Sequence, residues 1–141
     1  MRKEEYILLA KIYPEIQTTH TKYKNMFDFE NLEVYKKAKE LNKEILRFLR
    51  DNKQIDSYLR DQLRRASISM VINIAEGSGK FSKADKRNFY TISRGSVYEC
   101  VSLFEIIFEE NQVSKIDFNN YYQKFETISK MLLGLINSQR V

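Results

Sequence analysis

The sequence predicts an all-α protein, folded as an antiparallel up-down-up-down four-helix bundle. Its 141 residues include one proline and four glycines, which is too little turn-forming sequence for an all-β fold. Apolar residues instead recur every three or four positions in four long segments, as they do on one face of a helix. Short links join these segments, so neighbouring helices are expected to run antiparallel and to cross at roughly 20°.

Chain length and composition indicate one folded domain. A chain of 141 residues with 43% hydrophobic content can bury a single core. We expect the bundle domain to cover residues 26–141, with residues 1–25 forming a poorly ordered N-terminal extension. A short amphipathic helix from Glu4 to Tyr13 fits within that extension, because Pro14 disfavours helical geometry in the residue before it.

The first two bundle helices follow from capping residues and apolar stripes. Asn31 is a suitable N-cap for a helix ending near Asn52, and Asp56 or Ser57 can cap the next one. Lysines and arginines cover much of the rest of the first helix. The second helix should end at Gly77-Ser78-Gly79, because glycine accepts the left-handed backbone of many helix ends. The apolar stripe of the second helix is Leu59, Leu63, Ala66, Met70 and Ile74.

The last two helices are predicted over residues 83–110 and 118–138. Ser82 should cap the first of them and Asp117 the second. Gly95 falls inside the earlier helix, where an interior glycine costs about 1 kcal/mol relative to alanine. Either it allows another backbone to approach closely, or it is merely tolerated. The aromatic residues of these helices lie on the apolar stripes, so we interpret them as core residues rather than as platforms for base stacking.

Positive charge is concentrated in the middle of the chain. Residues 57–94 hold eight Lys/Arg and three Asp/Glu, whereas residues 95–141 hold four and six. An asymmetric basic region of this kind suggests a polyanionic partner. The alternative is a solvated helix surface whose lysines maintain solubility. The net charge of +5 does not decide between the two.

No combination of residues predicts catalysis, a metal or a cofactor. The one histidine, His20, lies in the extension, and Cys100 is the one cysteine, so neither a nucleophilic triad nor a zinc site can be assembled. Gly77-Ser78-Gly79 lacks the Lys-Ser/Thr ending of a phosphate-binding loop. No apolar run approaches the ~20 residues of a membrane span. We therefore expect a non-enzymatic, cytoplasmic protein.

Five short stretches carry a resemblance to a known family: Phe29 to Leu32, Val34 to Ala38, Gln62 to Ala66, Asn73 to Gly79, and Gly95-Ser96. They resemble the bacterial four-helix bundle proteins encoded in intervening sequences of 23S rRNA genes. Accessory variability determinant proteins of diversity-generating retroelements are similar. The likeness covers roughly residues 26 to 138, and family members begin near Met26. Many relatives carry a proline where this chain has Val71, so their proline kink is not expected here.

The resemblance implies a ring-shaped homo-oligomer, with five copies favoured, and structured RNA as the partner. On the residues alone, seven cations of the second and third helices and their link form the candidate nucleic-acid site, where they would bind backbone phosphates with little sequence reading. We also expect Asn73 or Glu76 to bind Arg94 and fix the register of those helices. The seven cations are Arg60, Arg64, Arg65, Lys80, Lys83, Lys86 and Arg87.

A second class of function stays open. The same basic face could dock an acidic protein partner, such as a reverse-transcriptase-like enzyme, in which case the protein is an adaptor.

Overall fold

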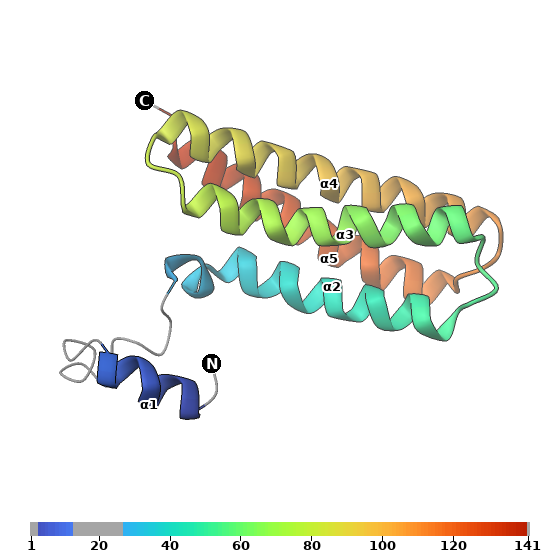
Figure 1. Cartoon of the computed structure of the whole chain (residues 1–141). Coiled ribbons are helices and arrows are strands. Elements are labelled where there is room, and N and C mark those ends of the chain that lie inside the picture. Colours follow the sequence, from blue (N-terminus) through green and yellow to red (C-terminus); the bar gives the residue numbers. More distant parts are fainter. Residues whose placement is uncertain (1–2, 13–26, 141) are drawn as a thin grey trace.

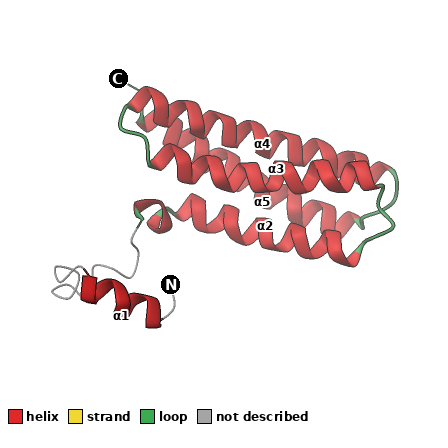
Figure 2. Cartoon of the chain, in the orientation of Figure 1, coloured by secondary structure: helices red, strands yellow, loops and turns green. Residues whose placement is uncertain are grey.

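The computed structural model describes residues 3–12 and 27–140 of the chain, and every regular element in them is helical. The all-α class is confirmed, and no strand occurs among the described residues (Figure 2). The described residues form five α-helices and one 3-10 helix. Their bounds are α1 Lys3–Ile12, η2 Asp28–Asn31, α2 Glu33–Asp51, α3 Ser57–Ser78, α4 Lys83–Glu109 and α5 Lys115–Ser138.

The four long helices α2 to α5 pack side by side, and each runs antiparallel to the one before it (Figure 1). α3 packs against α2 and α4, and α5 packs against α4 and α2. Their apolar stripes meet in one core, because a helix with a single apolar face is stable only when that face is covered. The largest fully buried side chains include Phe104, Phe125, Met70, Ile45 and Leu132.

The N-terminal part of the chain adds a helix to these four. α1 matches the short helix expected from Glu4 to Tyr13 to within one residue at each end. Among the described residues, α1 makes no contact with the longer helices. Pro14 and His20 lie outside the described residues, so the prediction of a poorly ordered extension stays a prediction.

Two of the expected N-caps are confirmed and two are wrong. Asp56 accepts hydrogen bonds from the Tyr58 and Leu59 amides, and Ser82 accepts one from Asp85. Asn31 ends η2, and Leu32 stands at the N-cap of α2 without a side-chain bond. Ser114, not Asp117, caps α5.

The reason for the second error is visible in the hydrogen bond itself. The backbone N–H of Asp117 donates to the hydroxyl of Ser114 at 3.1 Å, so Asp117 is already the third residue of the helix. An acidic residue there favours the positive end of the helix dipole, which makes it easy to mistake for the cap. α5 therefore begins one turn earlier than predicted, at Lys115.

Among the described helices, α3 and α4 share the most extensive contact. Inside their contact, Ser93 donates a hydrogen bond to the Met70 carbonyl oxygen at 2.6 Å, and Ser96 donates to the Ser69 hydroxyl at 2.8 Å. Small side chains that bond across the contact keep the backbones close and leave few buried polar groups without partners. α3 is one continuous helix through its middle, as expected without a proline.

The glycine that permits this close approach is Gly77, not Gly95. A Cβ atom placed on Gly77 would lie 2.7 Å from Cε1 of Tyr90 and 3.1 Å from Cβ of Phe89. A Cβ atom on Gly95 would meet nothing within 4 Å, which supports the interpretation that Gly95 is tolerated. Gly79 ends α3 with φ of −81°. The left-handed backbone predicted at this helix end is therefore absent, and that prediction is wrong.

We predict opposite effects of alanine at these two glycines. Gly77→Ala should lower the free energy of unfolding by about 1–3 kcal/mol, because the Tyr90 ring must move to admit the methyl group. Gly95→Ala should raise it by about 0.5–1 kcal/mol, because alanine favours an exposed helix interior. Urea unfolding followed by circular dichroism measures both. Equal effects of the two substitutions would contradict the assigned close approach.

Candidate nucleic-acid interface

The seven cations predicted as a site do not lie together. Arg60 is in the first turn of α3, whereas Lys80 and Lys83 flank the turn that joins α3 to α4. A helix rises about 1.5 Å per residue, so α3 places Arg60 and Lys80 roughly 30 Å apart, at opposite ends of the molecule (Figure 1). The seven predicted cations are therefore spread along the hairpin of α3 and α4 rather than gathered in one cluster.

Three of the seven side chains instead bind the carbonyl groups at helix C-termini. Arg60 donates to the Leu49 carbonyl oxygen at the end of α2 (3.1 Å), and Lys86 donates to that of Ser78 at the end of α3 (2.8 Å). Arg87 donates to the carbonyl oxygen of Gln139, the C-cap of α5, at 3.0 Å. Cations stabilise this negative end of the helix dipole. Part of the positive charge in the middle of the chain therefore stabilises helix ends within the fold.

The other four predicted cations are closer to solvent. Arg65, Lys80 and Lys83 are exposed, and the Lys80 ammonium lies 4.8 Å from the centroid of the Phe89 ring. Arg64 is half-buried and forms an ion pair with Asp61 at 3.0 Å, one turn earlier on α3. Exposed pairs of this kind contribute only about 0.3–0.5 kcal/mol, so Arg64 can exchange its partner for another anion.

A further basic surface lies on α2, outside the predicted site. A groove of about 470 Å³ runs along the outer side of this helix. We call its four cations the α2 basic face: Lys36, Lys39, Lys43 and Arg50. Asn42 and Leu46 complete its lining together with Glu40, the one acidic residue there. The lining of this groove therefore carries a net positive formal charge.

The spacing of the four cations along the chain explains why they share one face of α2. This spacing can be read from the sequence. Steps of three, four and seven residues return to the same side of a helix. Asn42 accepts a hydrogen bond from Ser67 of α3 at 2.7 Å, so the face borders α3. Arg64 lies one turn before Ser67 on that helix, which places it beside the α2 basic face.

Few carboxylates neutralise the α2 basic face. Lys36 forms an exposed ion pair with Glu33 at 3.1 Å, and Lys39 lies 5.9 Å from the centroid of the Tyr35 ring. Within the described part of the chain, Lys39, Lys43 and Arg50 have no acidic group at ion-pair distance. By contrast, Glu44 on the α5 side of α2 binds Lys124 at 2.7 Å. The unpaired cations therefore gather on the α3 side of α2.

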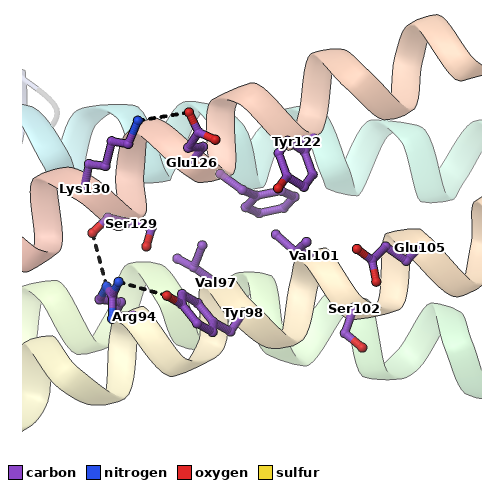
Figure 3. A pocket seen from close by; sticks show the side chains of 11 residues that line it. Arg94, Val97, Tyr98, Val101, Ser102, Glu105, Tyr122, Glu126, Ser129 and Lys130 are labelled. Atoms are coloured by element: carbon purple, nitrogen blue, oxygen red, sulfur yellow. Dashed lines mark hydrogen bonds and ion pairs between the residues drawn. The ribbon is translucent and has the colours of Figure 1, made fainter.

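A second groove, of about 430 Å³, separates α4 from α5 and has a different character. It is lined by apolar and aromatic side chains with both signs of charge, including Arg94, Glu105, Glu126 and Lys130 (Figure 3). Lys130 is paired with Glu126 at 3.1 Å. Since its charges balance, this groove does not favour a polyanion.

The bond predicted between Arg94 and Asn73 or Glu76 is absent. Arg94 donates instead to the Ser129 carbonyl oxygen at 3.3 Å and to the Tyr98 hydroxyl at 2.8 Å (Figure 3). It therefore joins α4 to α5. Asn73 donates to the backbone carbonyl and the hydroxyl of Ser69 within its own helix, and Glu76 is exposed.

The described residues lack a metal-binding cluster, and their one cysteine, Cys100, is buried. They contain no cluster of three or more His, Cys, Asp or Glu side chains that could hold an ion. Burial raises the pKa of the Cys100 thiol well above its usual range, which removes the thiolate needed for nucleophilic attack. None of the described helices is both long and apolar enough to cross a bilayer.

Comparison with known proteins identifies relatives of this chain. The sequence model of a family described as "23S rRNA-intervening sequence protein" matches residues 30–134. A crystal structure of a protein of unknown function from Bacteroides thetaiotaomicron, assigned to the S23 ribosomal protein family, has a TM-score of 0.68. It is 22% identical over 73% of this chain and 97% of its own, which is a likeness of fold. No curated protein matches.

We predict that Arg60 contributes to stability and not to a binding surface. Arg60→Ala should lower the free energy of unfolding by about 1–2 kcal/mol, because the Leu49 carbonyl loses a charged donor at a helix end. Arg65→Ala removes the same charge from an exposed position of α3 and should change the free energy of unfolding by less than about 0.5 kcal/mol. Chemical denaturation compares the two variants. An Arg60→Ala protein as stable as Arg65→Ala would contradict the capping role.

Proposed function

Because the chain belongs to the 23S rRNA-intervening sequence protein family, we propose that it is a non-catalytic module that binds RNA or other nucleic acid through the α2 basic face. The observation that supports this proposal best is the groove along α2, whose lining contains four cations and one carboxylate. Structured RNA is the favoured ligand, because the description of the family names a ribosomal RNA sequence.

The α2 basic face suits the backbone of a nucleic acid better than its bases. With a helical rise of about 1.5 Å per residue, its cations are spread over roughly 21 Å along the axis. That length brings several phosphates of a bound strand within reach. Lysines and arginines that bind phosphates release condensed counterions, which provides affinity but little sequence specificity. Binding should therefore depend strongly on salt and weakly on sequence.

Part of the predicted site joins this surface. Arg64 lies beside the α2 basic face on the neighbouring helix. Lys80 and Lys83 lie at the end of the molecule where α2 begins (Figure 1). Arg60, Lys86 and Arg87 act in this proposal as caps of helix C-termini, and Arg65 stays an exposed cation of α3.

Assembly into a ring-shaped homo-oligomer is the second part of the proposal. In it, α2 to α5 form a four-helix bundle and five copies make the ring, in the cytoplasm. Large apolar side chains that remain exposed on the outer helix surfaces support self-association; they include Ile68 and Ile72 of α3, Tyr98 of α4 and Leu133 of α5. A ring would present the α2 basic face once per copy, and such repetition increases avidity for a long polyanion.

We predict that reversing two charges of the α2 basic face abolishes most of the binding. Lys39→Glu/Lys43→Glu should weaken the affinity for a structured RNA at least tenfold at about 0.1 M salt, because two phosphate contacts become repulsive. The slope of log K against log salt concentration should fall by about two. Fluorescence anisotropy across a salt series measures both quantities.

The matched control is Lys53→Glu/Lys115→Glu, which makes the same change in net charge at two exposed residues outside the groove. Static light scattering should show that both variants keep the mass of the unaltered protein. Equal loss of binding in both would mean that net charge, and not the α2 basic face, holds the RNA. If the unaltered protein binds neither RNA, DNA nor heparin at low salt, the proposal is wrong, and an acidic protein becomes the expected partner.

A further inference from the structure

The turn between α3 and α4 presents a phenylalanine ring entirely to solvent. Phe81 has a relative exposure of 102%, the highest of the large apolar side chains in the described residues. Of the chain's nine phenylalanines, only Phe27 and Phe81 are strongly exposed. Exposing a ring that could be buried forgoes the transfer free energy that drives folding, so a fully exposed phenylalanine suggests a contact outside this chain.

The ring is displayed by an ordered turn. On one side of Phe81, the Gly79 amide donates to the carbonyl oxygens of Ala75 and Glu76, and the Lys80 amide donates to that of Gly77. On the other side, the Ser82 hydroxyl accepts from the Asp85 amide. These bonds hold the backbone on both sides of Phe81, so binding of a ligand to the ring orders little additional main chain.

Two exposed lysines flank this ring. Lys80 precedes Phe81, and Lys83 follows it in the first residue of α4. Asp85 is the nearest acidic residue in sequence, and it follows Phe81 by four positions. The immediate chain neighbours of Phe81 are Lys80 and Ser82, so the turn offers one isolated flat apolar ring between cations.

We propose that Phe81 stacks on an unpaired base of the bound nucleic acid, while Lys80 and Lys83 bind the phosphates on either side of it. This inference rests on the proposed function and adds a ligand class, a single-stranded or looped segment. One exposed ring next to cations matches the requirement of base stacking, which needs a single flat surface and a nearby backbone contact. A protein interface needs a larger apolar centre than one ring.

The position of the turn agrees with this role. α3 ends and α2 begins at the same end of the molecule (Figure 1), so the turn lies at one end of the α2 basic face. A structured RNA held along α2 by its phosphates can therefore extend an unpaired segment to Phe81. Double-stranded RNA keeps its bases stacked on one another, so it gains nothing from the ring.

The chain contains no tryptophan, which permits a direct test. In Phe81→Trp the indole is the sole tryptophan fluorophore and should be quenched when a short oligouridylate or oligoadenylate stacks on it. Heparin, a polyanion without bases, should leave the fluorescence unchanged. Tyr58→Trp is the matched control, because Tyr58 is 68% exposed in the first turn of α3, at the opposite end, and should not be quenched.

Affinity measurements complete the test. Phe81→Ala should weaken binding of the single-stranded oligonucleotide roughly tenfold and leave duplex RNA binding unchanged, and Phe81→Tyr should restore it. Two results would show that Phe81 does not stack on a base, while the proposed function would stand. In the first, the oligonucleotide binds Phe81→Trp without quenching its fluorescence. In the second, it binds Phe81→Ala as tightly as it binds the unaltered protein.

A lower mass of Phe81→Ala by light scattering would overturn the inference too, since the ring would then contact another copy. Loss of all nucleic-acid binding by the unaltered protein would refute the proposed function itself.

Discussion

The close contact between Gly77 of α3 and the Tyr90 ring of α4 is the constraint on which the rest of the structure depends. No side chain larger than hydrogen fits at Gly77 without moving the ring, and the Ser78 and Tyr90 hydroxyls share a hydrogen bond at 3.1 Å beside it. Because the two helices meet so closely there, their register is fixed next to the connecting turn. That register places Lys86 on the end of α3, and it displays Phe81 beyond both helices.

The distribution of cations follows from the helix ends. Each long helix has a C-terminus whose carbonyl groups attract positive charge, and Arg60, Lys86 and Arg87 bind three of these ends. These three cations are therefore engaged within the fold. On α2, Lys39, Lys43 and Arg50 have no acidic group at ion-pair distance in the described residues, so their charge is not neutralised within the fold. A basic segment of the sequence therefore does not predict a basic surface by itself, because some of its cations bind carbonyl groups at helix ends.

Most of the fold could be predicted from local patterns, and the errors come from contacts made at a distance. Apolar periodicity and the caps Asp56 and Ser82 are properties of a few neighbouring residues, so the long helices were predicted to within three residues at their ends. The partner of Arg94 is a backbone carbonyl 35 positions away, and nothing in the sequence marks one carbonyl among many. The cations of the α2 basic face share a local helical spacing that the sequence contains, whereas the three capping cations bind carbonyl groups that the sequence does not mark. Arg60 and Lys80 belong to one basic segment, yet a straight helix separates them.

The central claim is that nucleic acid binds to the α2 basic face, and lysine footprinting tests this claim most directly. The protein is acetylated with an amine-reactive reagent in the presence and absence of a bound structured RNA, and modification at each lysine is then quantified by mass spectrometry. We expect the RNA to protect Lys36, Lys39 and Lys43, with Lys53 and Lys115 as reactive as in the free protein. Protection of Lys53 and Lys115 while the α2 lysines stay reactive would show that the nucleic acid binds elsewhere and would contradict the account.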